Sequence, residues 1–271
     1  VSFITSTSGN SCASGTSTNN TPPVAIANPC NATSITIPAS TPFELTGSHT
    51  DGNSDAVTYN WEQYDPGPPH GAPNVACGST TGPIFRSYTP SNNPTRYFPS
   101  LTYILNNSNA PLATVGECLP TANRTLNFRL TVRDNNPNGG GIDVSALQLT
   151  VSNTTGPLAI TAPNTNVSWS TGGTNTVTWS GSNTSSICST VNIKLSVDGG
   201  QTFPYSLATN TANDGTQSIT LPSNLPPSST CRVKVESSCF TCVKFFDISN
   251  VNFTITSSCL VSISNICNNG P

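Results

Sequence analysis

The sequence predicts an all-β protein, and three observations support this fold class. Charged residues make up only 8% of the 271 residues, so Ser, Thr and Asn carry most of the polarity. Gly and Pro are abundant, at 20 and 23 residues; both destabilise helix interiors, whereas β-branched residues favour strands. Short stretches in which apolar and polar residues alternate recur along the chain, as in strands with one buried face.

The centre of the predicted fold is the stretch 43–64, which is typical of a strand, a polar turn and a second strand. In the second strand Val57, Tyr59 and Trp61 alternate with polar residues. The later stretch 126–135 alternates in the same way, with Phe128 among its inward residues. A Trp-bearing strand packed against such a late strand forms the centre of an immunoglobulin-like sandwich.

The length suggests two domains in tandem. The first is expected over 24–153, and a long insertion (65–123), rich in Pro and Asn, interrupts it. A connection of that length is usually functional or packed on itself, and 100–107 allows a helical turn or two. The strands expected in this domain are 24–27, 34–37, 43–46, 57–64, 126–132 and 145–151.

Regular short strands with turn signals between them predict a second immunoglobulin-like sandwich over 154–256. Its inward residues are expected to be Val167, Trp169, Val177, Trp179, Val191, Ile193, Leu195, Val197, Ile219, Leu221, Val233, Val235, Val251, Phe253 and Ile255. Two strand-like end segments flank the domains: a strand and Ser/Thr-rich linker over 1–23, and a tail over 257–271.

Ten cysteines in a chain with few charges indicate an oxidising setting, so we expect an extracellular or cell-surface protein. The alternative is a set of reduced thiols in the cytosol. The start at Val1 and the absence of Met lead us to expect a processed piece of a longer product. No run approaches the roughly 18 apolar residues that cross a bilayer, and a net charge of −3 argues against nucleic acid as a partner.

Sequence order suggests five disulfides, although order alone leaves many other pairings open. The expected pairs are Cys12–Cys30, Cys77–Cys118, Cys188–Cys231, Cys239–Cys242 and Cys259–Cys267. The CxxC at 239–242 has two other interpretations, half of a zinc site or a redox pair. No second pair of cysteines has that spacing, so a disulfide at a hairpin tip is favoured.

One turn carries oxygen ligands at alternate positions, which suits Ca²⁺. We expect a structural calcium site at the edge of the first sandwich, formed by Asp51, Asn53 and Asp55 with help from Asp134 and Asp143. The alternative is an ordinary Asx-rich turn, in which the side chains bond their own backbone. A second turn, 196–203, resembles the Asp-box of sialidases, and a hairpin turn accounts for its residues without any enzyme activity.

Several phrases resemble a two-module region of secreted proteins of the Bacteroidota. They include TPFELTGSHTDGNSDAVTYNWEQYDPGPPHGAP and GECLPTANRTLNFRLTVRDNNPNGGGIDV, and the match spans about 22–256. The resemblance implies tandem immunoglobulin-like or PKD-like accessory modules, which in that family follow a reprolysin-like zinc metalloprotease domain. Neither His49 nor His70 is followed by Glu, so the HExxH helix of a zinc protease has no counterpart here. Most of the cysteines depart from that family's pattern.

We therefore expect a non-catalytic extracellular structural or adhesive module. The strand-like ends could add to the sheet edges of a neighbouring copy and build a surface filament; packing on their own domains is the alternative. Two other functions remain open. One is an accessory region that positions substrate for, or spaces, a secreted metalloprotease, and the other is glycan binding through Tyr64, Tyr88 or Tyr97.

Overall fold

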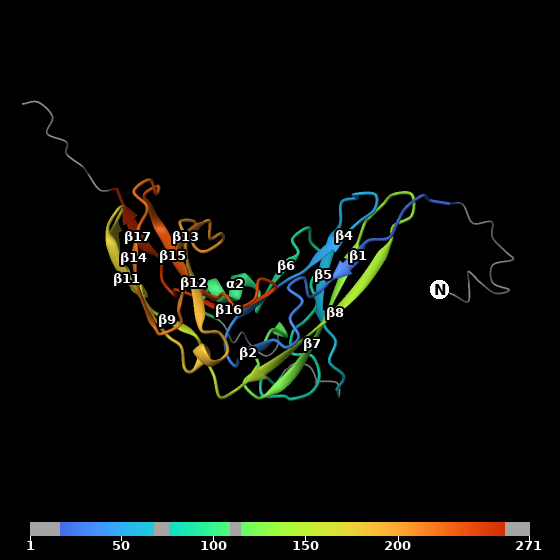
Figure 1. Ribbon diagram of the computed structural model, residues 1–271, viewed down its shortest axis with the longest axis horizontal. Coiled ribbons are helices and arrows are strands. Elements are labelled where there is room, and N and C mark those ends of the chain that lie inside the picture. Colours follow the sequence, from blue (N-terminus) through green and yellow to red (C-terminus); the bar gives the residue numbers. More distant parts are fainter. Residues whose placement is uncertain (1–16, 68–75, 109–114, 258–271) are drawn as a thin grey trace, which may run out of the picture.

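The computed structural model describes residues 17–67, 76–108 and 115–257, and almost all of its regular structure is strand. The all-β prediction is confirmed, with two immunoglobulin-like β-sandwiches that we call the first lobe (β1 to β8) and the second lobe (β9 to β17). Figure 1 shows the two lobes on either side of a middle region that holds α2, β6 and β16. Most of the expected strand-like tails, 1–16 and 258–271, lies outside the described residues.

The described part of the first lobe contains eight strands and one short helix. In chain order these are β1 (Val24–Ile26), β2 (Thr36–Pro38), β3 (Phe43–Thr46), β4 (Ser48–Thr50), β5 (Thr58–Gln63), β6 (Thr95–Phe98), α2 (Leu101–Leu105), β7 (Arg124–Arg133) and β8 (Ile142–Ser152).

The strand that bears Trp61 lies beside the late strand, as expected. β5 ends the sheet β2-β8-β7-β5 and pairs antiparallel with β7, with Trp61 opposite Leu130. Both side chains are buried. The indole N–H of Trp61 donates to the carbonyl of Pro94 at 2.9 Å, so its polar atom is satisfied inside the core.

Aromatic packing fills the interior between this sheet and β3 with β6. The rings of Phe43 and Phe98 stack with centroids 4.9 Å apart, and Phe98 lies at the same distance from Phe128. All three side chains are fully buried. The insertion expected at 65–123 thus supplies a strand to the sandwich, because Phe98 belongs to β6, which pairs with β3.

The second lobe contains nine strands and a 3-10 turn, η3 (Thr184–Ser186). The strands are β9 (Ala159–Ala162), β10 (Ser168–Ser170), β11 (Thr174–Ser180), β12 (Thr190–Ser196), β13 (Tyr205–Ala212), β14 (Thr216–Thr220), β15 (Ser228–Ser237), β16 (Val243–Ile248) and β17 (Phe253–Thr256).

A three-stranded sheet, β14-β11-β9, lies on one side of the second lobe's core, and a larger sheet built around β15 lies on the other. Trp169 and Trp179 are buried, as the alternation predicts, and Trp169 packs on Phe253 with ring centroids 4.6 Å apart. Val251 is an exception, because it is 40% exposed just before β17 begins.

β16 joins the two lobes. Its second half pairs with β15 of the second lobe, whereas its first half pairs antiparallel with β3 of the first lobe, with Lys244 opposite Glu44. One sheet therefore runs through both lobes, in the order β10-β17-β15-β16-β3-β6. The buried apolar side chains of both lobes also form one continuous cluster.

Three disulfides occur among the described residues. They are Cys30–Cys242, Cys77–Cys118 and Cys188–Cys239. The first links the lobes beside the contact of β16 with β3, since the carbonyl of Cys242 accepts the N–H of Thr46 at 2.8 Å. Cys77–Cys118 closes the insertion, as sequence order suggested. Together these bonds indicate an oxidising compartment.

Three of the expected pairs are wrong: Cys12–Cys30, Cys188–Cys231 and Cys239–Cys242. Pairing by sequence order fails because the sheets bring distant segments together; Cys30 and Cys242 are separated by 212 positions, yet their Cα atoms lie 5.7 Å apart. Cys231 is a buried free thiol on β15. Cys259 and Cys267 lie outside the described residues.

Candidate metal centre and the other site residues

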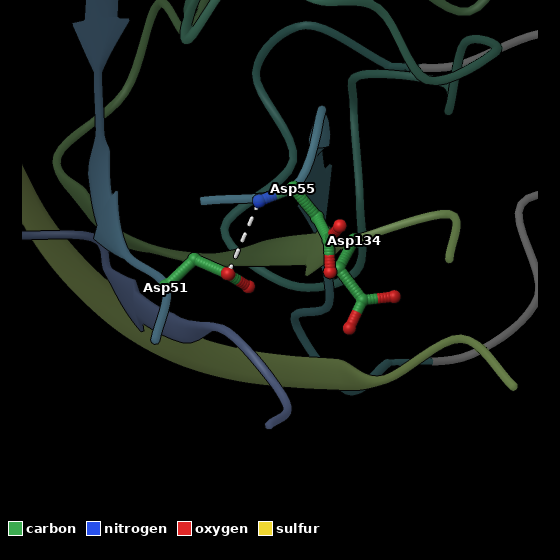
Figure 2. Close-up of side chains that lie close together, drawn as sticks. All are labelled: Asp51, Asp55 and Asp134. Carbon is green, nitrogen blue, oxygen red and sulfur yellow. Dashed lines mark hydrogen bonds between the residues drawn. The ribbon is translucent and has the colours of Figure 1, made fainter. Parts of the chain in front are cut away.

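Two paired strands of the first lobe bring three of the predicted calcium ligands together. Asp51 follows β4, Asp55 lies in the turn before β5, and Asp134 directly follows β7. Because β5 and β7 run antiparallel with Thr58 opposite Arg133, the start of one strand and the end of the other lie at the same edge. Figure 2 shows the three aspartates at this edge. We call Asp51, Asp55 and Asp134 the acidic cluster.

The acidic cluster has dimensions that suit Ca²⁺. One carboxylate oxygen from each residue lies within 4.8 Å of the others. Ligand oxygens sit 2.3–2.6 Å from Ca²⁺, so two ligands on opposite sides of the ion are at most about 5.2 Å apart. Within the described part of the chain, no Lys or Arg forms a salt bridge with any of the three.

Hydrogen bonds already hold all three carboxylates in place, and that of Asp55 accepts the side-chain amide of Asn136 at 3.0 Å. Oδ1 of Asp51 accepts the backbone N–H of Asn53 at 2.8 Å and of Asp55 at 3.2 Å (Figure 2 draws the second). This is the Asx turn of the alternative interpretation. The other oxygen, Oδ2 of Asp51, is buried and lacks a hydrogen-bond partner among the described residues, which leaves it available to a cation.

Asp134 is the buried member of the cluster. Its carboxylate accepts the side-chain amide of Asn20 at 2.6 Å and the backbone N–H groups of Asn136 and Gly141 at 3.2 and 2.7 Å. Burial works against ionisation, but these hydrogen bonds outweigh it and lower the pKa of Asp134. The residue is therefore an ionised oxygen donor at neutral pH.

The other two predicted ligands have different partners. Oδ1 of Asn53 accepts the N–H of Thr21 at 2.6 Å. Oδ2 of Asp143 accepts the N–H of Ala25 at 2.8 Å and so fixes β1 against β8. Asp143 is not part of the group of three carboxylates that lie close enough together to hold an ion.

The Asp-box-like turn of the second lobe satisfies its own backbone. Asp198 accepts the N–H of Thr202 at 3.0 Å and the hydroxyls of Thr202 and Ser196 at 2.6 Å each. Burial alone would raise the pKa of Asp198, but these hydrogen bonds lower it to about 2. The geometry is that of a stabilised hairpin turn.

Arg124, the first residue of β7, holds irregular backbone of the insertion. Its side chain is only 1% exposed, donates to the carbonyls of Ser79 and Gly82 at 2.9 and 2.7 Å and pairs with Asp65 at 3.4 Å. One guanidinium group thus ties two backbone carbonyls and a carboxylate of the insertion together, a structural role.

A buried ion network that was not predicted from the sequence lies at the junction of the lobes. Lys234, on β15, lies 2.8 Å from Glu44 of β3 and 2.8 Å from Glu236. Lys244 and Lys194 pair with the same carboxylates at 2.9 to 3.4 Å. We call these five residues the junction ion network. Charged residues within strands were the available signal, but Glu44 and Lys234 are separated by 190 positions in the sequence.

The network residues shift one another's ionisation. Burial works against the charge on Lys234, but Glu44 and Glu236 outweigh it and raise the pKa of the lysine. Burial would also raise the pKa of Glu236, yet Lys234 and then Lys244 lower it to about 2. The network thus combines three lysines with two glutamates.

None of the described residues forms a helix with the length and hydropathy that crossing a bilayer requires.

Comparisons with known proteins add little beyond the fold. No protein-family model matches the chain, and no curated protein sequence matches it. The chain is similar to a chimeric titin Z1Z2 at 11% identity and a TM-score of 0.26, covering 88% of this chain and 99% of that one. Fibronectin(III)-like modules of Clostridium thermocellum CbhA match at 10% identity and 0.25, over 85% and 92%. Similarity at this level bears on no function.

Proposed function

We propose that this chain is a non-catalytic extracellular module with a structural or adhesive role, a subunit of a surface filament in which neighbours exchange terminal strands. The observation that supports it best is the union of the lobes through β16, which pairs with both β15 and β3. The disulfide Cys30–Cys242 spans the same junction. A unit joined in this way transmits force without a hinge between its sandwiches.

Strand exchange is the proposed means of assembly. The described sheets have open ends, such as β10 and β2, and open edges accept extended segments. The segments 1–16 and 258–271 would supply the exchanged strands. A head-to-tail contact that does not close on itself produces a filament.

Negative-stain electron microscopy of the purified chain tests this proposal. We expect ordered fibres from the full chain and dispersed particles from a variant that lacks 1–16 or 258–271. The double-lobed particle itself should be unchanged by either deletion. Dispersed monomers from the full chain at every concentration would contradict assembly by strand exchange.

A second function has a weaker basis, the resemblance to modules that follow a reprolysin-like metalloprotease domain in secreted Bacteroidota proteins. In that case the chain would be an accessory region that positions substrate or acts as a spacer. The gene sequence upstream of Val1 distinguishes the two, because an HExxH-bearing domain there favours the accessory role.

We also propose that the acidic cluster binds a structural Ca²⁺. The supporting observation is the buried, unpartnered Oδ2 of Asp51 beside the carboxylates of Asp55 and Asp134. A bound ion would connect the turn before β5 to the end of β7, and its two positive charges would offset two of the three negative charges of the acidic cluster.

Calcium is expected to raise the melting temperature, because it would bind only the folded state; 100-fold excess over Kd adds about 2.7 kcal/mol. Asp51→Asn should abolish the calcium-dependent shift, while Asp214→Asn, at an exposed turn of the second lobe, should leave it unchanged. The measurement is differential scanning fluorimetry in calcium and in chelator. Identical melting curves of the unmodified protein in calcium and in chelator would disprove the calcium site.

A further inference from the structure

A cleft of about 330 Å³ opens at the edge of the first lobe, between β5 and β6. Each of these strands ends its sheet, so the cleft lies where the two sheets of the sandwich separate. The backbones of Tyr59 and Ser91 exchange two hydrogen bonds, 2.8 and 3.0 Å long, at one side of it. A cleft of this size is in the range of small-molecule sites.

Aromatic rings and short polar side chains line the cleft. Trp61, Tyr88 and Tyr97 supply the rings, and Asn60, Thr89 and Asn93 are among the polar residues. Tyr88 is 37% exposed although its ring lies against a guanidinium group. The ring therefore has both a fixed position and a surface that a ligand can reach.

The charged residue of the first cleft, Arg96, is already paired with a carboxylate. Arg96 pairs with buried Glu117 at 2.9 Å and donates to the carbonyls of Trp61 and Arg86 at 2.5 and 2.6 Å. Its guanidinium group is held 4.8 Å from the centre of the Tyr88 ring. An anionic ligand would thus find a positive charge that a carboxylate already neutralises, so the cleft suits an uncharged ligand.

Uncharged hydrogen-bonding groups remain free in the cleft. The side chains of Asn60 and Thr89 make no hydrogen bond to any other described residue, and Asn93 uses only its Oδ1, which accepts the N–H of Thr95. Amides and hydroxyls can both donate and accept. They match a ligand whose own groups are hydroxyls.

A second cleft of about 350 Å³ adjoins the first at β6. The two share Asn93, Thr95 and Tyr97, and the second is lined mostly by polar groups, including all five residues of the junction ion network, whose charges pair with one another. The combined groove crosses β6 and reaches the strands of the second lobe. A ligand that occupies it is an extended chain of several units.

We propose that this groove binds a neutral oligosaccharide, with one or two sugar units in the cleft beside Tyr88. A sugar ring presents an apolar C–H face, which packs on an aromatic ring, and a rim of hydroxyls, which bond to groups such as the Asn60 amide. This combination matches the fixed, exposed ring, the free amides and the neutralised charge. Sugar binding does not depend on filament assembly, so either can fail alone.

The test is isothermal titration of the full chain with neutral hexasaccharides of glucose, xylose, mannose and galactose, each used separately. A hexamer of galacturonic acid serves as the anionic probe. We expect at least one neutral hexamer to bind in the micromolar to millimolar range and the anionic hexamer to bind more weakly. Failure of all four neutral probes to bind, or tighter binding of the anionic one, would overturn the proposal.

Variants locate the site with the hexamer that binds. Asn60→Ala and Tyr88→Ala should each lower the affinity at least tenfold, and Tyr88→Phe, which keeps the ring over Arg96, should retain it within about threefold. Tyr64→Ala is the matched control, since Tyr64 is 42% exposed but lies outside the cleft. Melting curves of each variant show whether a lost affinity is caused by unfolding. Equal losses for Tyr64→Ala and Asn60→Ala would place the sugar elsewhere and contradict the assignment.

Discussion

At the scale of single residues, the feature that distinguishes this chain is a buried lysine between two lobes. Lys234 is 4% exposed, and its ammonium group lies 4.2 Å from the centre of the Phe246 ring as well as beside two carboxylates. Removing one partner from a buried ion network leaves uncompensated charge, which costs more than the network contributes when complete.

Lys234→Met should therefore destabilise the protein by about 3–5 kcal/mol. The matched control is Lys194→Met, because Lys194 has a 31% exposed side chain and pairs with the same Glu236; its loss should be about 1 kcal/mol or less. Urea unfolding at pH 7 gives both values. Equal effects of the two substitutions would show that Lys234 is not buried among carboxylates.

Asp247, on β16, carries a second residue-scale prediction. Its carboxylate is 6% exposed and accepts the N–H of Ile160 at 2.7 Å. Burial raises the pKa of Asp247 to about 6. The folded state thus binds this proton more tightly than the unfolded state, so the group's contribution to stability is largest below about pH 4 and is lost as the pH rises through 6.

Asp247→Asn keeps a carbonyl oxygen for Ile160 without the charge. It should gain about 2–3 kcal/mol over the unmodified protein above pH 6 and nothing near pH 4, given 1.36 kcal/mol per pKa unit. Denaturant unfolding at a series of pH values measures the difference. A gain that is independent of pH would contradict the raised pKa of Asp247.

At the scale of elements, β16 is the strand on which the arrangement of the lobes depends. The first half of β16 pairs with β3, and next to this pairing the N–H of Phe246 donates to the carbonyl of Pro42 at 2.9 Å. The second half of β16 pairs with β15. The hairpin expected around the CxxC at 239–242 predicts a strand directly after that motif. It could not predict the partner β3, because two sheet edges from segments 200 residues apart carry no shared pattern in the sequence.

Hydrogen exchange tests this pairing. Backbone amides of β16 and β3 should exchange only through global unfolding, with protection equal to that of the central strand β7. Mass spectrometry of peptides over 40–46 and 242–248 gives the rates. Fast exchange of both peptides, with β7 still protected, would mean that the lobes separate in the native state.

The sequence predicted elements with strong alternation better than short or polar ones. β3 begins and ends where expected, and β5 and β7 differ from expectation by one or two residues at each end. β4, β6, β9 and β13 were missed: the first three have only three or four residues, and β13 has mostly polar residues. β6 also lies within the Pro-rich insertion, where tertiary pairing with β3 outweighs local signals.

The residues of the candidate sites were likewise predicted best where they lie close together in the sequence. Sequence spacing identified Asp51 and Asp55, and Asp134 joined them because β5 pairs with β7. Asp143 is on the neighbouring strand, but its carboxylate accepts the N–H of Ala25. This partner could not be predicted from the sequence, because it depends on the position of β1. The groove beside Tyr88 depends on how β6 approaches β5, so a list of exposed tyrosines could not locate it.

At the scale of the whole molecule, the account depends on two sandwiches that share one sheet, one apolar core and one disulfide. Residues 28 to 46 of the first lobe and 242 to 246 of the second meet along this junction, with Cys30 bonded to Cys242 at one end. Closing a loop of 212 positions restricts the unfolded chain strongly, and in the chain-entropy model longer loops give larger stabilisation.

Disulfide mapping by mass spectrometry is the most direct test of this junction. The unreduced protein, with all accessible free thiols blocked under denaturing conditions, is digested with pepsin at low pH so that the bonds do not rearrange. The account predicts a fragment in which the peptide 239–242 is linked both to Cys30 and to Cys188, with the blocking group on Cys231. A closed bond between Cys239 and Cys242, with Cys30 linked to Cys12, would contradict it.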